Sequence, residues 1–276
     1  MSRNMGENDL TLERARATSV GSELFDDHGR RIPPELKSAV HGDTRQRFTC
    51  AQPVIDYGEI HKRIKSHFGA RDALSASEFE SRAEMILKGL RSDARIKNIV
   101  DGVRVPFFLP KATYADLGQD LDETYLPAVQ RSFQEEFPER SFTNYCKSGL
   151  AGKLGIASGS RHEQLLSAMQ HGVVVGYYFP CLLEYSVPAA IEQMRDLPGQ
   201  FLLAGGFDTC AAFVGSPDLL LRRDGYPPLL WLAALSGEKE GVGYHFEAYG
   251  YNLTFNRRPH FGHAAEYWAS GLVVLG

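Results

Sequence analysis

The chain lacks the charge and the apolar runs that would direct it to a nucleic acid or a membrane. Its 276 residues hold 30 Lys and Arg against 34 Asp and Glu, so no basic excess would attract phosphates or an anionic membrane surface. The longest apolar run covers residues 172–183 and is too short for a spanning helix. The first residues include Glu7, Asp9 and Glu13 and no apolar segment, unlike a secretory signal. We therefore expect a soluble chain with no nucleic-acid partner and no membrane partner.

Cysteines and phosphate-binding loops are also scarce. Cys50, Cys146, Cys181 and Cys210 are widely spaced, and no two of them form a C-x-x-C pair. Such spacing is typical of reduced thiols and not of a zinc knuckle or a disulfide framework, so we expect a cytoplasmic location. The glycine-rich segment 148–160 fits neither the Walker A spacing nor the G-x-G-x-x-G fingerprint, which leaves a nucleotide loop without support.

What is present is the composition of an ordinary globular protein, with 43% hydrophobic and 23% charged residues. Residues 1–50 are polar and contain Pro33-Pro34, which predicts a partly disordered N-terminal arm. Residues 51–147 show mainly helical patterns, whereas residues 148–276 carry most of the strand patterns. We therefore expect three regions, the last two being either separate units or one continuous domain from residue 51.

Helical spacing of apolar residues dominates the first half. Ser75 and Glu78 match a capping box at the start of one amphipathic segment. Residues 99–109 contain Pro106 and are typical of an edge strand, because proline removes an amide donor from a sheet. Helices are predicted at residues 54–68, 75–90 and 124–136.

Alternating and continuous apolar runs dominate the second half. Residues 173–179 predict a buried strand, residues 242–249 and 251–256 a pair of strands around Gly250, and residues 272–275 a central last strand. Helices are predicted at residues 160–172, 186–197 and 227–235. The sequence thus predicts an α+β fold, with a helical N-terminal half and a mixed, largely antiparallel sheet with flanking helices in the C-terminal half.

The stretch Gln200–Gly215 is the most strand-like apolar segment of the chain, and we expect the core to form around it. It contains Asp208 and Cys210. A carboxylate in an apolar segment is costly unless it is paired or lies at a pocket, so Asp208 is a candidate catalytic group. Cys210 is either a nucleophile or, as its apolar neighbours favour, a packed core thiol.

Histidines gather near the C-terminal end. His245 and Glu247 share one face of a predicted strand and form a candidate acid–base pair for catalysis. His260 and His263 follow after a turn. Together, His245, Glu247, His260 and His263 are candidate ligands for a divalent metal such as zinc or iron, although no H-E-x-x-H or H-x-H motif supports them.

Two classes of function fit these residues. The first is a soluble cytoplasmic enzyme of small-molecule metabolism, a hydrolase or group transferase that uses Asp208 with His245 and Glu247, with or without a metal. The second is a non-catalytic partner-binding or immunity-type protein that docks through its N-terminal arm and its late aromatic residues. The enzyme hypothesis requires the three acid–base residues to converge in a pocket. The sequence identifies neither the substrate nor the oligomeric state.

Overall fold

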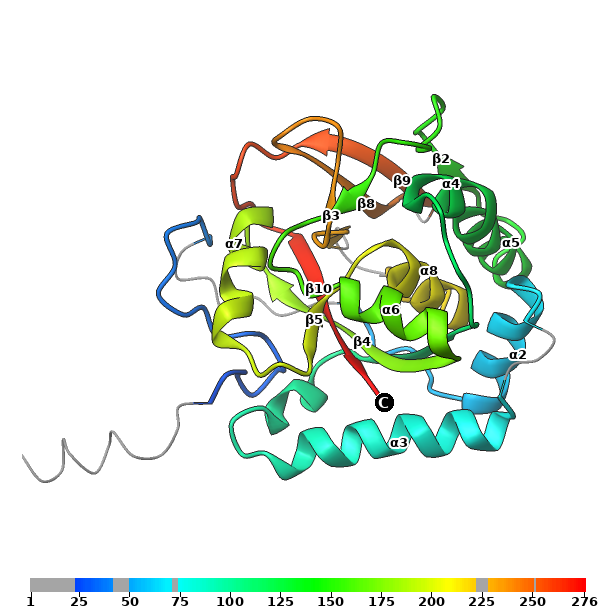
Figure 1. The fold of residues 1–276 in the computed structure, drawn as a ribbon, viewed down its shortest axis with the longest axis horizontal. Coiled ribbons are helices and arrows are strands. Elements are labelled where there is room, and N and C mark those ends of the chain that lie inside the picture. The colour runs from blue at the N-terminus through cyan, green and yellow to red at the C-terminus, as the bar shows by residue number, and fades with distance from the viewer. Residues whose placement is uncertain (1–22, 42–49, 71–73, 222–227, 251) are drawn as a thin grey trace, which may run out of the picture.

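The computed structural model describes residues 23–41, 50–70, 74–221, 228–250 and 252–276. These residues form the predicted α+β fold, with helices mostly between residues 57 and 136 and a mixed sheet built largely in the C-terminal part (Figure 1). Most of the predicted disordered arm, residues 1–22 and 42–49, lies outside the described residues. No helix in the described ranges is both long enough and apolar enough to cross a membrane.

Two of the predicted helices begin at capping side chains, whereas the helix predicted from residue 160 begins only at Glu163 and has no side-chain cap. Ser75 accepts a hydrogen bond from the Glu78 amide, and Ser186 accepts one from the Ala189 amide, so both predicted caps are confirmed. The α-helices are α2 (Tyr57–His67), α3 (Ala76–Ser92), α4 (Leu117–Asp120), α5 (Leu126–Glu136), α6 (Glu163–His171), α7 (Val187–Glu192) and α8 (Gly206–Gly215). The 3-10 turns are η1 (Lys97–Asp101) and η3 (Gln193–Asp196), and η2 (Leu121–Tyr125) is a π-helical turn.

The main sheet takes strands from both halves of the chain. Its order is β1-β4-β10-β6-β8-β9-β2, and β5 also pairs with β10; only β10–β6 and β2–β9 run parallel. The predicted edge strand around Pro106 and the predicted central last strand are both confirmed. The strands are β1 (Val105–Leu109), β2 (Phe142–Asn144), β4 (Val174–Leu183), β5 (Phe201–Leu203), β6 (Leu229–Trp231), β8 (Val242–Tyr249), β9 (Asn252–Pro259) and β10 (Trp268–Leu275), and β3 (Gly155–Ile156) pairs separately with β7 (Leu235–Ser236).

The core forms around helix α8, in the centre of Figure 1. Every residue of α8 is buried, and the helix packs against β1 and β4 of the sheet and against α2, α5 and η2. A helix buried on all sides needs no polar face, which explains why its sequence shows no amphipathic period. The expectation that Gln200–Gly215 lies at the centre of the core is therefore confirmed.

The conformation predicted for that segment is wrong. Only Phe201–Leu203 form a strand, and the chain turns at Ala204-Gly205 into the helix. A continuous apolar run cannot distinguish a buried strand from a buried helix. The helix predicted at residues 227–235 is also wrong where the structure describes it, because Leu229–Trp231 and Leu235–Ser236 pair as strands.

Helices α4 and α5 form one rod interrupted by the π-helical turn η2 (Figure 1). Within η2 the Leu126 amide donates to the Leu121 carbonyl, one residue further back than in an α-helix. Such turns are rare and frequently occur at functional sites. This one places Tyr125 beside the first turn of α8, where its ring stacks on Phe207.

Candidate functional site

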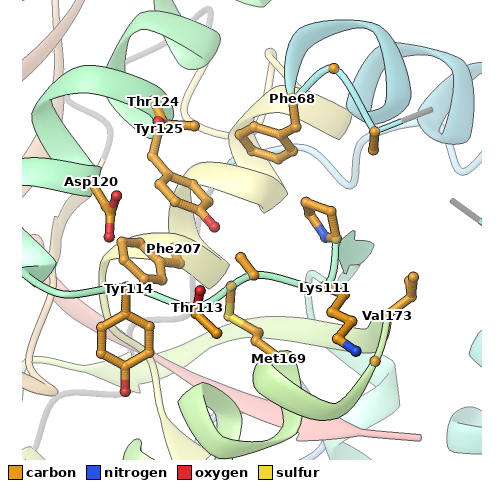
Figure 2. A pocket seen from close by; sticks show the side chains of 15 residues that line it. Phe68, Lys111, Thr113, Tyr114, Asp120, Thr124, Tyr125, Met169, Val173 and Phe207 are labelled. Carbon is orange, nitrogen blue, oxygen red and sulfur yellow. The ribbon is translucent and has the colours of Figure 1, made fainter. Parts of the chain in front are cut away.

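A cavity of about 650 Å³ opens beside the N-terminal end of α8 (Figure 2). Its walls come from the ends of α2 and α6, the loop after β1, the π-helical turn η2 and the first turn of α8. Ligand pockets in proteins typically have volumes of this order and bring together distant parts of the chain. We call it the η2 cavity, after the turn that carries Tyr125.

Aromatic rings form much of the wall. Tyr125 and Phe207 stack face to face with centroids 4.1 Å apart, and Phe68 lies 5.1 Å from the Tyr125 ring. Tyr114 meets Phe207 edge-on at 6.1 Å. This packing fixes the rings in place, so the cavity has a preformed apolar lining.

The Tyr125 hydroxyl is a polar group directed into this lining (Figure 2). The Tyr125 side chain is 5% exposed and lines the cavity. Burial raises the pKa of Tyr125, and the nearby Cys210, Asp120 and Asp208 raise it further. The hydroxyl is therefore a neutral donor available to a ligand.

Asp120 is the second polar group of the cavity. It ends α4, and its Oδ2 atom is buried without a hydrogen-bond partner among the described residues. Desolvation raises its pKa, and the neighbouring carboxylates of Glu123 and Asp116 raise it further. A buried acceptor with no partner is rare in folded proteins and marks a place where a ligand group would be stabilised.

Asp208, the carboxylate singled out in the sequence, has a different role. It is fully buried at the third position of α8, and both of its oxygens accept the Gly205 amide proton at 3.0 Å. This bond satisfies the helix N-terminus as the acid of a capping box does. Desolvation raises the pKa of Asp208, whereas His162 and the Gly205 amide lower it. Asp208 thus has its partners inside the protein.

His162 is a buried residue near Asp208 that the sequence interpretation missed. Its Nδ1 atom lies 3.2 Å from the Leu203 carbonyl, so Nδ1 carries the proton. The ring lies directly against Gly205, where a Cβ atom would come within 2.4 Å of Nε2. In the sequence, the start of α8 was indicated by Asp208, an acid three residues after Gly205, as in a capping box.

Cys210 lies on the same helix and is fully buried. Desolvation raises its pKa well above the ordinary value, and the nearby Asp208 raises it further. A thiol in this environment stays protonated and is a poor nucleophile. The geometry favours the core-thiol alternative for Cys210.

His245 and Glu247 do come together on β8. Their Nε2 and Oε2 atoms are 3.7 Å apart, and His245 is 1% exposed whereas Glu247 is partly open to solvent. Desolvation lowers the pKa of His245, and the Glu247 carboxylate raises it in part. Among the described residues, no hydrogen bond or ion pair links this pair to Asp208, whose carboxylate accepts the Gly205 amide proton.

The predicted metal ligands are arranged differently from a metal site. His245 and His260 each pack against the Trp231 ring, at 5.1 and 5.7 Å between centroids, and His260 Nδ1 accepts the Gly262 amide proton at 3.0 Å. His263 follows in the same turn. The described residues hold no group of three or more His, Cys, Asp or Glu side chains placed to bind a metal ion, so a zinc or iron site at these histidines stays a prediction.

Most of the late aromatic residues belong to the core. Tyr177, Tyr178, Trp231 and Tyr244 are buried, whereas Tyr249 is exposed. A continuous aromatic docking face therefore has little support in the described residues, and the proposed docking arm lies mostly outside them.

The residues of the η2 cavity were not selected from the sequence. Asp120, Tyr125 and Phe207 are 87 positions apart at their extremes, and no spacing motif links them. Comparison of the chain with protein-family models, with curated proteins and with solved structures found no match, so the residues themselves carry the functional argument.

Proposed function

We propose that this protein binds a small organic molecule in the η2 cavity. The observation that carries the proposal is a preformed aromatic cavity lined by two polar side chains: Tyr125, whose hydroxyl points into it, and Asp120, whose buried Oδ2 has no hydrogen-bond partner among the described residues. Pockets with an apolar lining and a few convergent polar groups are the usual sites of small-molecule recognition. The polar pair would orient the ligand, and the rings would bury its apolar part.

Whether the bound molecule is also transformed stays a prediction. A hydrolase or transferase that uses Asp208, Cys210, His245 and Glu247 would require substrate access to groups that are mostly buried. The η2 cavity offers Asp120 as a more accessible acid–base group, and desolvation raises its pKa above the ordinary value. An enzyme of small-molecule metabolism therefore fits best if its reaction takes place at Asp120.

A fragment screen by ligand-observed NMR tests the proposal. The variant Ala112→Trp would fill the cavity, because Ala112 forms part of its wall. The matched control is Met85→Trp, which adds the same ring to the exposed face of α3, where Met85 is 60% exposed. Fragments should bind the wild type and Met85→Trp and should lose at least tenfold in affinity for Ala112→Trp.

Two outcomes would overturn the proposal. One is a screen in which no fragment binds the wild-type protein. The other is a set of fragments that bind a correctly folded Ala112→Trp variant as tightly as the control. Circular dichroism and the melting temperature establish that each variant is folded before its binding is compared.

A further inference from the structure

We propose that the ligand of the η2 cavity is an organic cation whose ammonium group lies against Asp120. This inference rests on the proposed function and specifies the chemical class of the ligand. It starts from the Asp120 carboxylate, whose buried Oδ2 has no hydrogen-bond partner in the described residues. A carboxylate shielded from water is stabilised most by an opposite charge that donates to it or lies beside it.

The protein supplies no such charge from the described residues. Lys111 is the cationic side chain of the cavity wall, but it is exposed and lies on the far side of the cavity from Asp120 (Figure 2). No ion pair joins the two among the described residues. Lys111 would instead repel a cation from that side, so it favours a ligand whose charged end points toward Asp120.

The carboxylates next to Asp120 add to the negative potential. Asp116 is held by the amides of Gln119 and Gly152, at 2.8 and 2.7 Å, and Glu123 accepts from the Gln119 side chain at 3.2 Å. These two acids therefore have partners of their own, whereas Asp120 Oδ2 has none among the described residues. A cation bound at Asp120 would lie in the field of all three carboxylates.

The C-terminal ends of two helices also favour a cation in the cavity. Helix α2 ends at the cavity with its C-cap Phe68, and α6 ends there with its C-cap Gly172. The C-terminal end of a helix carries a partial negative charge, which favours a cation. The positive N-terminal end of α8 also reaches the cavity, but Asp208 already caps it. The backbone dipoles thus agree with the side-chain charges.

The tyrosine and the aromatic rings complete the site. Tyr125 is 5% exposed, and its hydroxyl is directed into the cavity. Aromatic rings attract cations to their faces, and they also accept neutral aromatic molecules. The rings alone therefore do not decide the class of ligand, whereas the unpaired carboxylate does. An alkylammonium or quaternary ammonium group would neutralise the Asp120 carboxylate and also pack against the aromatic rings.

The test compares a cation with a neutral molecule of nearly the same shape and then adds a larger aromatic cation. Choline and its neutral isostere 3,3-dimethyl-1-butanol have nearly the same shape, and benzyltrimethylammonium adds an aromatic body. Their affinities for the wild type are measured by titration calorimetry and by NMR. We expect each cation to bind at least tenfold more tightly than the neutral probe, and Asp120→Asn to remove that preference.

The matched control is Glu123→Gln, three residues away on the exposed side of the same rod. It should lower cation affinity less than threefold, because Glu123 acts only at a distance. If the neutral probe binds as tightly as choline, the cation inference is overturned while small-molecule binding stands. If no cation binds, or if Asp120→Asn binds the cations unchanged, the inference is overturned whatever the fragment screen finds.

Discussion

Two carboxylates near the N-terminal end of α8 have opposite surroundings. Asp208 and Asp120 both have a pKa raised by desolvation, but Asp208 is bonded to the Gly205 amide and Asp120 has no partner in the described residues. Burial alone therefore does not separate a structural acid from a functional one. The two kinds of acid are distinguished by whether groups of the protein donate hydrogen bonds to the carboxylate.

The largest expected effect on stability comes from replacing Asp208, the carboxylate that has a hydrogen-bond partner in the protein. Asp208→Ala should lower the free energy of unfolding by about 3 kcal/mol, because it removes a helix cap and leaves the buried Gly205 amide unpaired. Urea denaturation measures the loss. Asp208→Asn keeps one acceptor oxygen and should lose less than half as much. An unchanged urea midpoint for Asp208→Ala would show that the cap contributes little.

The position of the unsatisfied carboxylate depends on Gly118. A Cβ atom at Gly118 would come within 1.8 Å of the Leu150 carbonyl oxygen, so Gly118→Ala must displace α4 and with it Asp120. We expect a loss of about 2–3 kcal/mol in the free energy of unfolding and weaker ligand binding. The control is Gly89→Ala in α3, where nothing lies within 4 Å of the new Cβ, and which should gain up to about 1 kcal/mol.

Asp120→Asn should act in the opposite direction from Asp208→Ala. Because the folded protein raises the pKa of Asp120, its charge destabilises the fold at neutral pH, and this cost disappears as the pH falls through the folded pKa toward the ordinary value. The variant should therefore be more stable at pH 7 by up to about 1 kcal/mol, with little gain near pH 4. Paired urea denaturation curves at the two pH values measure this. A destabilised variant would mean that Asp120 has a protein partner.

The smallest effect concerns His245 and Glu247, which form a partly satisfied pair. The pKa of His245 is lowered in the fold, so stability is lost as the pH falls below the ordinary value of 6.5. Glu247 opposes that shift, and Glu247→Gln should increase the loss between pH 7 and 5 by less than about 1 kcal/mol. The control is Glu59→Gln, which breaks an exposed pair with Lys62. Equal losses in the two variants would show that the pair is not coupled.

The sequence predicted the parts of the fold that depend on local patterns. The amphipathic helix after Ser75, the edge strand at Pro106 and the hairpin around Gly250 each have a period or a turn residue of their own. Helix α8 has none, because a helix buried on every side shows no alternation. The helix signal was the acid three residues after Gly205, which the apolar run obscured.

The candidate site was much less predictable. Asp208 was correctly identified as an unusual buried acid, but its partner is the backbone amide of Gly205, which no side-chain motif reports. Asp120 precedes the helix predicted at residues 124–136 and was not selected as a candidate. Its lack of a partner depends on how η2 and α8 pack together, which is a property of the tertiary structure.

The π-helical turn determines the angle about the helix axis between the two polar groups of the cavity, Asp120 and Tyr125. An α-helix advances about 100° per residue, and η2 adds one residue to the turn between Asp120 and the start of α5. Deleting one residue of η2 would restore a regular α-helix and rotate Asp120 by that angle relative to the α5 residues that pack on α8. The protein would keep its core and lose the cavity's charge.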